Sequence, residues 1–489
     1  MIEESLKIHD KFSFEIKLGF NARRKQKFSD FALNFWFFIP NSLDMNPQTY
    51  TKKDFYKDLM SNIRLITPIF LLRDIASHEN SPFVALEKSF MVLASNPSRS
   101  HAADFEYHIK MFLTILKSTL RDHIAHLIMG KNEEDRLYLL NDYIKNLKII
   151  IDRYRELRKI INAPTITTEY FNFYLFGDEF LSNVAEQHSY KLLRSLQFDS
   201  SPEIATIKDQ IYELINKEVE YKKEQGYLVV DKMDSKRNRE LIFRLGLLKK
   251  FAENELFLTA NKKKDGVLIQ QVYYSIAAGI SMIFATAIAF SFQLKFGNFT
   301  MPLFVGLVVS YMLKDRIKEL ARYYFAHKLG KGYFDNKIKI SLKDNKIGWS
   351  KEAMDFITDD KVPAEVMKIR NRSSILEANN RSFSEKIILY RRLVRLFRKE
   401  LDSCIQYDTS GINDIIRFNI SGMVTKMDNP DFPLFTGCES NEIQVIKGER
   451  VYYLNLVMQL KNENQVDYRR YRIALNRNGI LDVESFDIK

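Results

Sequence analysis

Two pairs of aspartate and histidine lie in one predicted helix, residues 101–129. In each pair the aspartate precedes the histidine by four residues, which places both side chains on the same face of a helix. The pairs are Asp104 with His108 and Asp122 with His126, and His101 precedes the first pair. Imidazole and carboxylate groups can bind a metal ion or transfer protons in catalysis. These five residues are the candidates for chemistry in this chain.

The distance between the two pairs argues against a single metal centre. Asp104 and Asp122 are eighteen residues apart, so the pairs lie about 27 Å apart along a helix that rises about 1.5 Å per residue. Metal sites in helical bundles often use a Glu-x-x-His pattern on facing helices, and this chain has no such pattern. An aspartate four residues before a histidine is also an ordinary surface pair. We expect no metal, and a membrane-tethered enzyme that uses this His/Asp site in the N-terminal bundle is the alternative function.

Sequence signatures of known catalytic classes do not occur in the chain. It has no GxxxxGK[ST] phosphate loop, no glycine-rich dinucleotide fingerprint, no HExxH, no GxSxG and no EF-hand loop. The two cysteines, Cys404 and Cys438, are not arranged as CxxC, which argues against a disulfide framework and a structural zinc site. We expect no cofactor, and a role in binding rather than catalysis.

A long uncharged segment interrupts this otherwise highly charged chain. No charged residue occurs between Gly266 and Leu294, and after Lys295 the chain is uncharged again from Phe296 to Leu313. A helix needs roughly 20 apolar residues to cross a hydrocarbon core about 30 Å thick. The first part has this length, whereas the second, with 18 residues, is marginal. The pattern predicts a two-helix transmembrane hairpin at 266–313; the alternatives are a partly inserted second helix and a hairpin buried in a soluble core.

Basic residues flank this segment on both sides, and the predicted turn between its helices carries only Lys295. An excess of lysine and arginine marks the cytoplasmic ends of spanning helices. We therefore expect a multi-pass protein of the inner plasma membrane, with both termini in the cytoplasm and no cleavable signal peptide. Contacts with anionic lipid headgroups are expected from Lys262, Lys263, Lys264, Lys314, Arg316, Lys318 and Arg322.

Small residues recur every fourth position along both predicted membrane helices. Such a stripe lets two helix backbones approach closely in lipid. The stripe consists of Ala277, Ser281, Ala285 and Ala289 on the first helix and of Gly306 and Ser310 on the second. It serves either the hairpin itself or a homo-oligomer, and in an oligomer the helices could line a pore.

Hydrophobic periodicity predicts an α+β membrane protein with a mostly helical cytosolic bundle. Strict alternation in 12–20 and 31–39 predicts an N-terminal β-hairpin, and helical spacing follows from residue 51 to residue 260. Alternation after residue 411 and the Asn478–Gly479 turn predict an antiparallel β-meander. The predicted regions are a hairpin and bundle at 1–260, the membrane hairpin at 266–313, a basic amphipathic helix at 314–334, a short hairpin with helices at 350–358, 363–378 and 384–406 within 335–410, and a β module at 411–489. Whether the N-terminal hairpin and the C-terminal strands form one structure stays open.

The net charge is +12, which fits a protein that contacts an anionic surface. We expect a membrane-anchored scaffold or signalling protein that presents a helical bundle and a β module at the inner membrane surface. Its expected partners are anionic lipids and other proteins; nucleic acid is not expected. The alternatives are a membrane-tethered enzyme that uses the His/Asp residues, and an oligomeric pore or membrane-perturbing effector.

Overall fold

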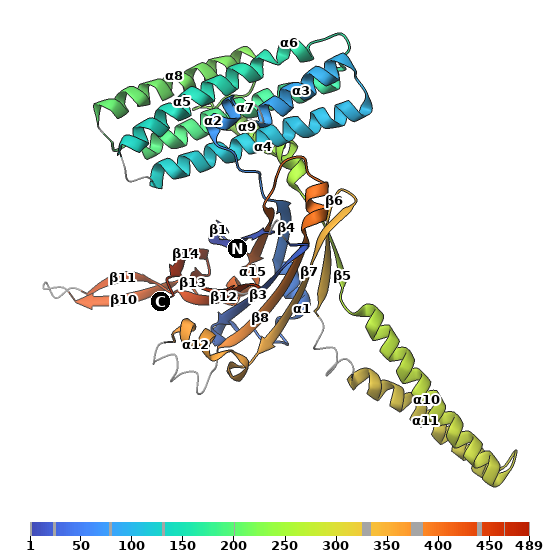
Figure 1. Cartoon of the computed structure of the whole chain (residues 1–489). Coiled ribbons are helices and arrows are strands. Elements are labelled where there is room, and N and C mark those ends of the chain that lie inside the picture. The colour runs from blue at the N-terminus through green and yellow to red at the C-terminus, as the bar shows by residue number, and fades with distance from the viewer. Residues whose placement is uncertain are drawn as a thin grey trace. The chain divides into compact units, whose positions relative to one another are not determined.

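The computed structural model describes residues 2–22, 26–77, 81–129, 133–199, 201–324, 334–372, 385–437, 443–463 and 465–488. The chain forms two compact units, and both are drawn in Figure 1. Unit 1 consists of Met1–Arg64, Leu258–Gln406 and Ser410–Lys489, and unit 2 of Leu65–Phe257 with Tyr407–Thr409. The β structure of both chain ends thus belongs to one unit, whereas the predicted region 1–260 had joined the N-terminal strands to the helices.

An eight-stranded antiparallel sheet forms the framework of unit 1. Its strands follow the order β14-β13-β12-β3-β8-β7-β6-β5. Their bounds, in the same order, are Gly479–Phe486, Gln465–Asn476, Tyr452–Asn462, Phe28–Ile39, Lys386–Phe397, Asn345–Ile357, Asn336–Leu342 and Thr259–Lys264. The sheet therefore brings strands from the N-terminus, the middle and the C-terminus of the chain together.

A second sheet of four strands, in the order β1-β2-β9-β4, packs against the first through aromatic side chains. Its strands are Ile2–Asp10, Ser13–Asn21, Gly411–Asn419 and Leu59–Leu65. The ring of Phe418 on β9 stacks on Phe37 of β3 at 5.4 Å and lies 5.6 Å from Phe55 of α1, Lys52–Asp58. These side chains are almost fully buried, so the core of unit 1 lies between the two sheets.

The predicted N-terminal β-hairpin is wrong, although both of its strands exist. β2 pairs with β1 and β9, whereas β3 pairs with β8 and β12 in the other sheet. Strand alternation identifies a strand but not its partner, because partner choice depends on residues far along the chain. Because β12 pairs with β3, the N-terminal and C-terminal strands form one structure, which the sequence had left open.

The predicted helices 350–358 and 384–406 are also wrong, because β7 and β8 occupy most of these ranges. In β8, alternate residues from Ile388 to Leu396 are buried, which is the burial pattern of a strand. Arg392 takes one of the buried positions and is fully enclosed. Because a charged residue takes an inward position, the apolar–polar alternation of a strand is interrupted in the sequence. Arg391 and Arg395, four residues apart, then match the spacing of a basic helix face. Of the predicted helix 363–378, α12 covers Ala364–Arg370, and the positions after residue 372 lie outside the described residues.

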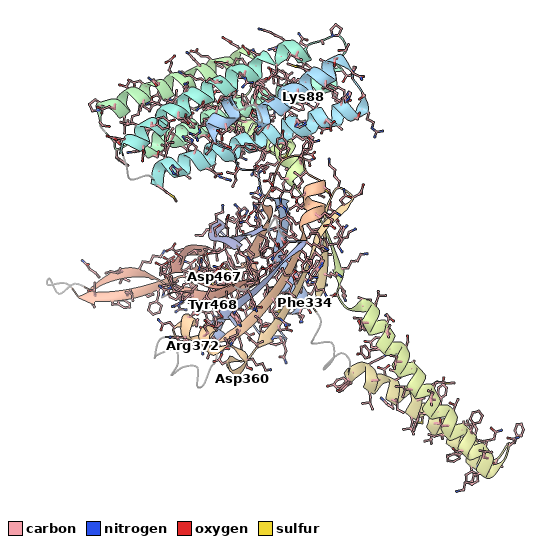
Figure 2. The ribbon with its side chains drawn as sticks, viewed as in Figure 1. Lys88, Phe334, Asp360, Arg372, Asp467 and Tyr468 are labelled. Carbon is pink, nitrogen blue, oxygen red and sulfur yellow. The ribbon has the colours of Figure 1, made fainter. Side chains whose placement is uncertain are left out.

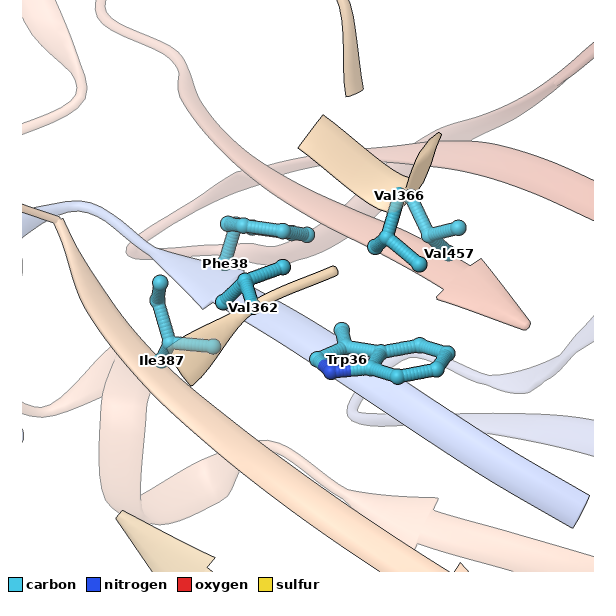
Figure 3. Close-up of a cluster of buried hydrophobic side chains, with 6 residues drawn as sticks. All are labelled: Trp36, Phe38, Val362, Val366, Ile387 and Val457. Carbon is cyan, nitrogen blue, oxygen red and sulfur yellow. The ribbon is translucent and has the colours of Figure 1, made fainter. Parts of the chain in front are cut away.

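A small hydrophobic cluster covers part of the other face of the large sheet (Figure 3). α12 and the turn before it supply Val366 and Val362. They pack against Trp36 and Phe38 of β3, with Ile387 and Val457 from the neighbouring strands. The remaining short elements of unit 1 are η1 Asn41–Leu43, η5 Asp359–Lys361, α14 Arg398–Ser403, α15 Ser421–Val424 and the two-stranded sheet of β10 Asp431–Gly437 with β11 Ile443–Glu449.

Unit 2 is helical, close to the helices that periodicity predicts. Its helices are α2 Leu72–Ser77, α3 Pro82–Ser95, α4 Arg99–Met129, α5 Glu133–Glu156, α6 Arg158–Ile161, α7 Thr168–Ser195, α8 Pro202–Glu224 and α9 Ser235–Glu253, followed by η2 Asn254–Leu256. Every residue of α7 from Gly177 to Glu186 is buried, so α7 is the central helix of the unit. Ser81 caps α3 by accepting a hydrogen bond from the Val84 amide, with Pro82 at the first helical position.

The predicted two-helix transmembrane hairpin is contradicted. α10, Val267–Phe296, and α11, Met301–Tyr324, pack side by side as an arm (Figure 1), but among the described residues only α10 is long and apolar enough to cross a bilayer. The uncharged part of α11, Met301–Leu313, has 13 residues and measures about 20 Å, short of the hydrocarbon thickness of about 30 Å. Lys314, Asp315 and Arg316 follow at once. Two passes, and with them the expected multi-pass topology, are therefore not supported.

Candidate functional site

The arm formed by α10 and α11 exposes an unusual amount of apolar surface. Only 11% of the most apolar stretch of α10 is buried. The large exposed side chains include Leu268, Ile276, Ile280, Ile283, Phe290 and Leu294 on α10 and Phe304, Val308 and Met312 on α11. Soluble monomers rarely expose contiguous apolar patches larger than a few hundred Å². The arm is therefore the part of unit 1 that most clearly lacks a covering surface.

The predicted stripe of small residues lies between the two helices of the arm. Ser281, Gly306 and Ser310 are buried there although neighbouring side chains are exposed. The hydroxyl of Ser310 donates a 2.9 Å hydrogen bond to the carbonyl of Ala285. A Cβ on Gly306 would lie 2.7 Å from the ring of Phe292. In this structure the stripe joins α10 to α11, with Ala277 buried and Ala289 half-buried beside it.

Both ends of the arm start from neighbouring strands of the large sheet. β5 ends at Lys264 and pairs antiparallel with β6, which begins at Asn336. The Asp265 amide donates to the carbonyl of Asp335 over 3.2 Å, so the chain leaves and re-enters the sheet at almost the same point. The two strands that flank the arm must therefore lie on the same side of any membrane.

The seven residues predicted to contact lipid headgroups differ in their present partners. Lys262 forms a 2.5 Å ion pair with the buried carboxylate of Glu352, and Lys318 and Arg322 have acidic partners one turn earlier on α11, at 3.6 and 3.0 Å. The Lys314 ammonium lies 3.8 Å from the ring centre of Tyr311. Lys263 and Lys264 are exposed, as is Arg316. The basic residues thus gather where the arm joins β5 and on the last turns of α11.

The residues predicted for chemistry do not come together. His101 and His108 lie in the first half of α4, where their rings bond the carbonyl of Asn96 and the hydroxyl of Tyr407, both at 2.8 Å. Asp122, near the end of α4, accepts bonds from Ser118 and Arg121 at 3.3 and 2.8 Å. Asp104 and His126 are exposed. Among the described residues, no three side chains of the metal-binding types form a group that could hold an ion.

A cavity in the described part of unit 2 lies beside the second half of α4. It measures about 270 Å³ and is lined mainly by Pro68–Leu72, Thr119, Asp122, His123, His126 and Leu139. The ring of His123 bonds the carbonyl of Leu139 at 3.1 Å, and burial lowers its pKa. Sequence reasoning selected Asp122 and His126 but not His123, since its position in a pocket depends on α5 and on the segment before α2.

Two buried clusters of charged residues were not predicted from the sequence. In unit 1, Arg392 pairs with Asp414 of β9 at 2.5 Å and donates to Ser61 of β4 at 3.2 Å. In unit 2, burial raises the pKa of Asp178, although the nearby Arg155 guanidinium opposes this shift. Asp178 accepts hydrogen bonds from Tyr221 and Tyr227 at 2.8 and 3.0 Å. These clusters tie strands or helices together, and neither lines a cavity given above.

Comparisons with known proteins give no relative. No family model matches this chain, and neither a curated protein nor a solved structure matches it.

Proposed function

We propose that this protein attaches to a membrane from one side through the arm and presents its two units as binding surfaces at that membrane. Anionic lipids and other proteins are its partners in this proposal. The arm acts as a monotopic anchor, meaning that it enters the bilayer and returns to the side it came from. This replaces the two transmembrane helices expected from the sequence.

The exposed apolar surface of α10 carries the proposal. Burial of apolar surface contributes roughly 25 cal/mol per Å², so a helix exposed in this way loses a large stabilisation unless something covers it. Lipid covers a helix on all of its sides at once. The apolar side chains of α10 fit such a cover, because they lie on every side except the one that faces α11.

The connection to the sheet supports entry and return on one side. Because β5 and β6 pair directly, a single crossing by α10 would leave the chain on the wrong side for β6. The uncharged part of α11 is too short to bring it back across. At about 20 Å, that part is long enough for one leaflet, whose hydrocarbon is about 15 Å thick, half of the bilayer value. At the turn, Gln293 donates to Asn298 at 2.9 Å, so these two amides partly satisfy each other.

A binding role is favoured over catalysis by the arrangement of the polar residues. The His/Asp candidates are spread along α4, and the cavity beside His123 is small and mostly apolar. The basic residues are the lysines before α10 and the residues from Lys314 to Arg322. They lie on the side of the membrane that holds the sheet. By the distribution of positive charge, this is the cytoplasmic side.

Vesicle flotation of the full-length protein tests the proposal. The wild-type protein is expected to float with phosphatidylcholine vesicles. A variant with Phe290→Asp and Leu294→Asp, two exposed positions near the turn of the arm, should lose at least about 100-fold in partitioning, because each carboxylate costs about 2.5–3.5 kcal/mol inside the hydrocarbon. The matched control carries Phe198→Asp and Met233→Asp in unit 2, where both side chains are almost fully exposed, and should float like the wild type.

The same experiment can contradict the proposal. If the wild-type protein stays with the aqueous fraction as a stable oligomer, and the Phe290→Asp, Leu294→Asp variant is monomeric, then a second copy covers the arm instead of lipid. If both pairs of substitutions reduce flotation equally, the effect follows net charge and the arm is not an anchor.

A further inference from the structure

Three lysines lie directly opposite one another on β5, β6 and β7. Lys263 is the register partner of Lys337, and Lys337 is the register partner of Lys351. Lys339, two residues further along β6, is opposite Asn261 on one side and Trp349 on the other. Cross-strand partners project from the same face of a sheet, so these residues form one basic face, which we call the lysine face: Lys263, Lys337, Lys339, Trp349 and Lys351.

The lysine face points to solvent. The residues between its members, including Ile338, Ile340 and Ser350, are buried on the opposite face of the sheet. Lys263, Lys337 and Lys339 are exposed, and Trp349 and Lys351 are half-buried. The face is thus a surface available for a partner, at the edge of the sheet from which the arm begins.

This row of lysines is unfavourable for the sheet by itself. Like charges directly opposite each other destabilise an antiparallel pair. Lys351 has a carboxylate partner, Asp265 at 2.8 Å, but Lys263, Lys337 and Lys339 form no ion pair with any residue in the described part of the chain. An anionic surface would remove the repulsion between Lys263 and Lys337 and would also give Lys339 a partner of opposite charge.

Aromatic rings lie among the basic groups. The indole ring of Trp349 has the ammonium groups of Lys337 and Lys351 at 5.9 Å and the guanidinium of Arg395 at 5.3 Å. Phe334, labelled in Figure 2, has Lys351 at 6.0 Å. Tryptophan is enriched where proteins meet the headgroup region, because its ring is apolar and its N–H is polar. Basic and aromatic residues together are typical of a surface that rests on headgroups.

We propose that the lysine face binds the anionic headgroups of the membrane that the arm enters. The inference rests on the proposed function and adds the chemistry of the lipid. Continuity carries it: Lys263 is four residues before α10 begins at Val267, so insertion of the arm holds β5 and its neighbours at the surface. The alternative ligand of a basic and aromatic face is nucleic acid, and it lacks this connection to the arm.

The test compares two kinds of vesicle and two triple variants of the full-length protein. The first variant carries Lys263→Gln, Lys337→Gln and Lys339→Gln. The control variant carries Lys88→Gln, Lys223→Gln and Lys232→Gln at three exposed lysines of unit 2. These substitutions remove the same net charge as those of the first variant. Partitioning is measured into phosphatidylcholine vesicles with and without phosphatidylglycerol. A duplex DNA oligonucleotide serves as the competing probe.

Lysines near an anionic bilayer each contribute about fivefold to partitioning. The first variant is therefore expected to lose about 100-fold in binding to vesicles with phosphatidylglycerol and to bind phosphatidylcholine like the wild type. The control variant should keep most of the preference for anionic vesicles. An equal loss in both variants would overturn the inference, as would an unchanged preference in the first variant.

Failure of the anchor can be told apart from failure of the lysine face. If the arm does not insert, the wild-type protein fails to bind phosphatidylcholine vesicles, and the proposed function falls with the inference. If the wild type binds phosphatidylcholine and the first variant loses only DNA binding, the anchor stands. In that case the lysine face is a nucleic-acid surface and the lipid inference is wrong.

Discussion

Gly177 lies at the centre of unit 2, where α7 passes Tyr154 of α5. A Cβ at this position would lie 2.1 Å from the Tyr154 hydroxyl, which donates to the carbonyl of Tyr174 at 3.1 Å. We predict that Gly177→Ala lowers the free energy of unfolding by about 1–3 kcal/mol, the usual cost of overpacking. Urea unfolding followed by circular dichroism measures this change.

Gly246 of α9 provides the control for this prediction, because an added Cβ there would meet no atom within 4 Å. Gly246→Ala should stabilise the protein by up to about 1 kcal/mol through helix propensity alone. Equal effects of the two substitutions would show that the contact with Tyr154 carries no cost.

His188 of α7 makes the stability of unit 2 depend on pH. Burial lowers its pKa to about 4 from the ordinary value of 6.5, and its ring bonds the carbonyl of Val184 at 2.8 Å. Between pH 6.5 and pH 4, His188 is protonated in the unfolded chain but neutral in the folded chain. The free energy of unfolding therefore falls as the pH falls through this range. The full shift corresponds to about 3 kcal/mol.

Urea unfolding at several pH values between 4 and 7 checks this prediction. A His188→Gln variant should lose this part of the pH dependence, whereas His126→Gln, at an exposed position of α4, should keep it. A His188→Gln variant with the full wild-type dependence would assign the effect to other groups.

At the level of elements, helices were predicted well and strands with buried charges were not. α3, α4, α7 and α8 begin within two residues of their predicted starts, because amphipathic spacing and N-terminal caps are local signals. β8 was missed because Arg392 is satisfied by Asp414 on β9 and by Ser61 on β4, residues that no local pattern connects to it. For the same reason the lysine face was not predictable, since only the strand register places Lys263 beside Lys337.

The arm yields a prediction about which side of the membrane its turn reaches. In a protein with Cys404→Ser and Cys438→Ser, a cysteine introduced by Asn298→Cys lies between α10 and α11. A monotopic arm keeps this cysteine from a membrane-impermeant maleimide trapped inside the vesicles. Detergent should then make the cysteine reactive, which shows that the thiol is intact.

A Lys264→Cys variant in the same background serves as the positive control, because Lys264 is exposed at the end of β5. It should react with maleimide added outside the vesicles. Labelling of the Asn298→Cys protein from inside the vesicles would mean that the arm spans the bilayer, contrary to the proposal.

For the whole molecule, the division into units predicts how truncation acts. Unit 2 is an almost continuous segment, Leu65–Phe257, whereas unit 1 needs three separate segments of the chain. A fragment of residues 65–257 should fold into helices and unfold cooperatively. A chain that ends at residue 410 lacks β9 and β12, so β2 and β3 lose partners along one edge and unit 1 should not fold.

Limited proteolysis and circular dichroism separate these two outcomes. The fragment should resist trypsin as the helices of the full-length protein do, and the truncated chain should lose protection in β2, β3 and β8 while keeping it in α4 and α7. Protected strands in the truncated chain would show that unit 1 folds without its C-terminal part.

The position of the arm within unit 1 also sets an order of events during synthesis. β3 lies between β8 and β12, so β3 lacks one of its two partner strands until the ribosome has made residue 462, the end of β12. The arm ends at Tyr324 and leaves the ribosome well before that. For that interval a long apolar helix is exposed on a nascent chain whose sheet is still unfinished. The first partner of this helix must therefore be either a ribosome-associated targeting factor or chaperone, or the membrane itself.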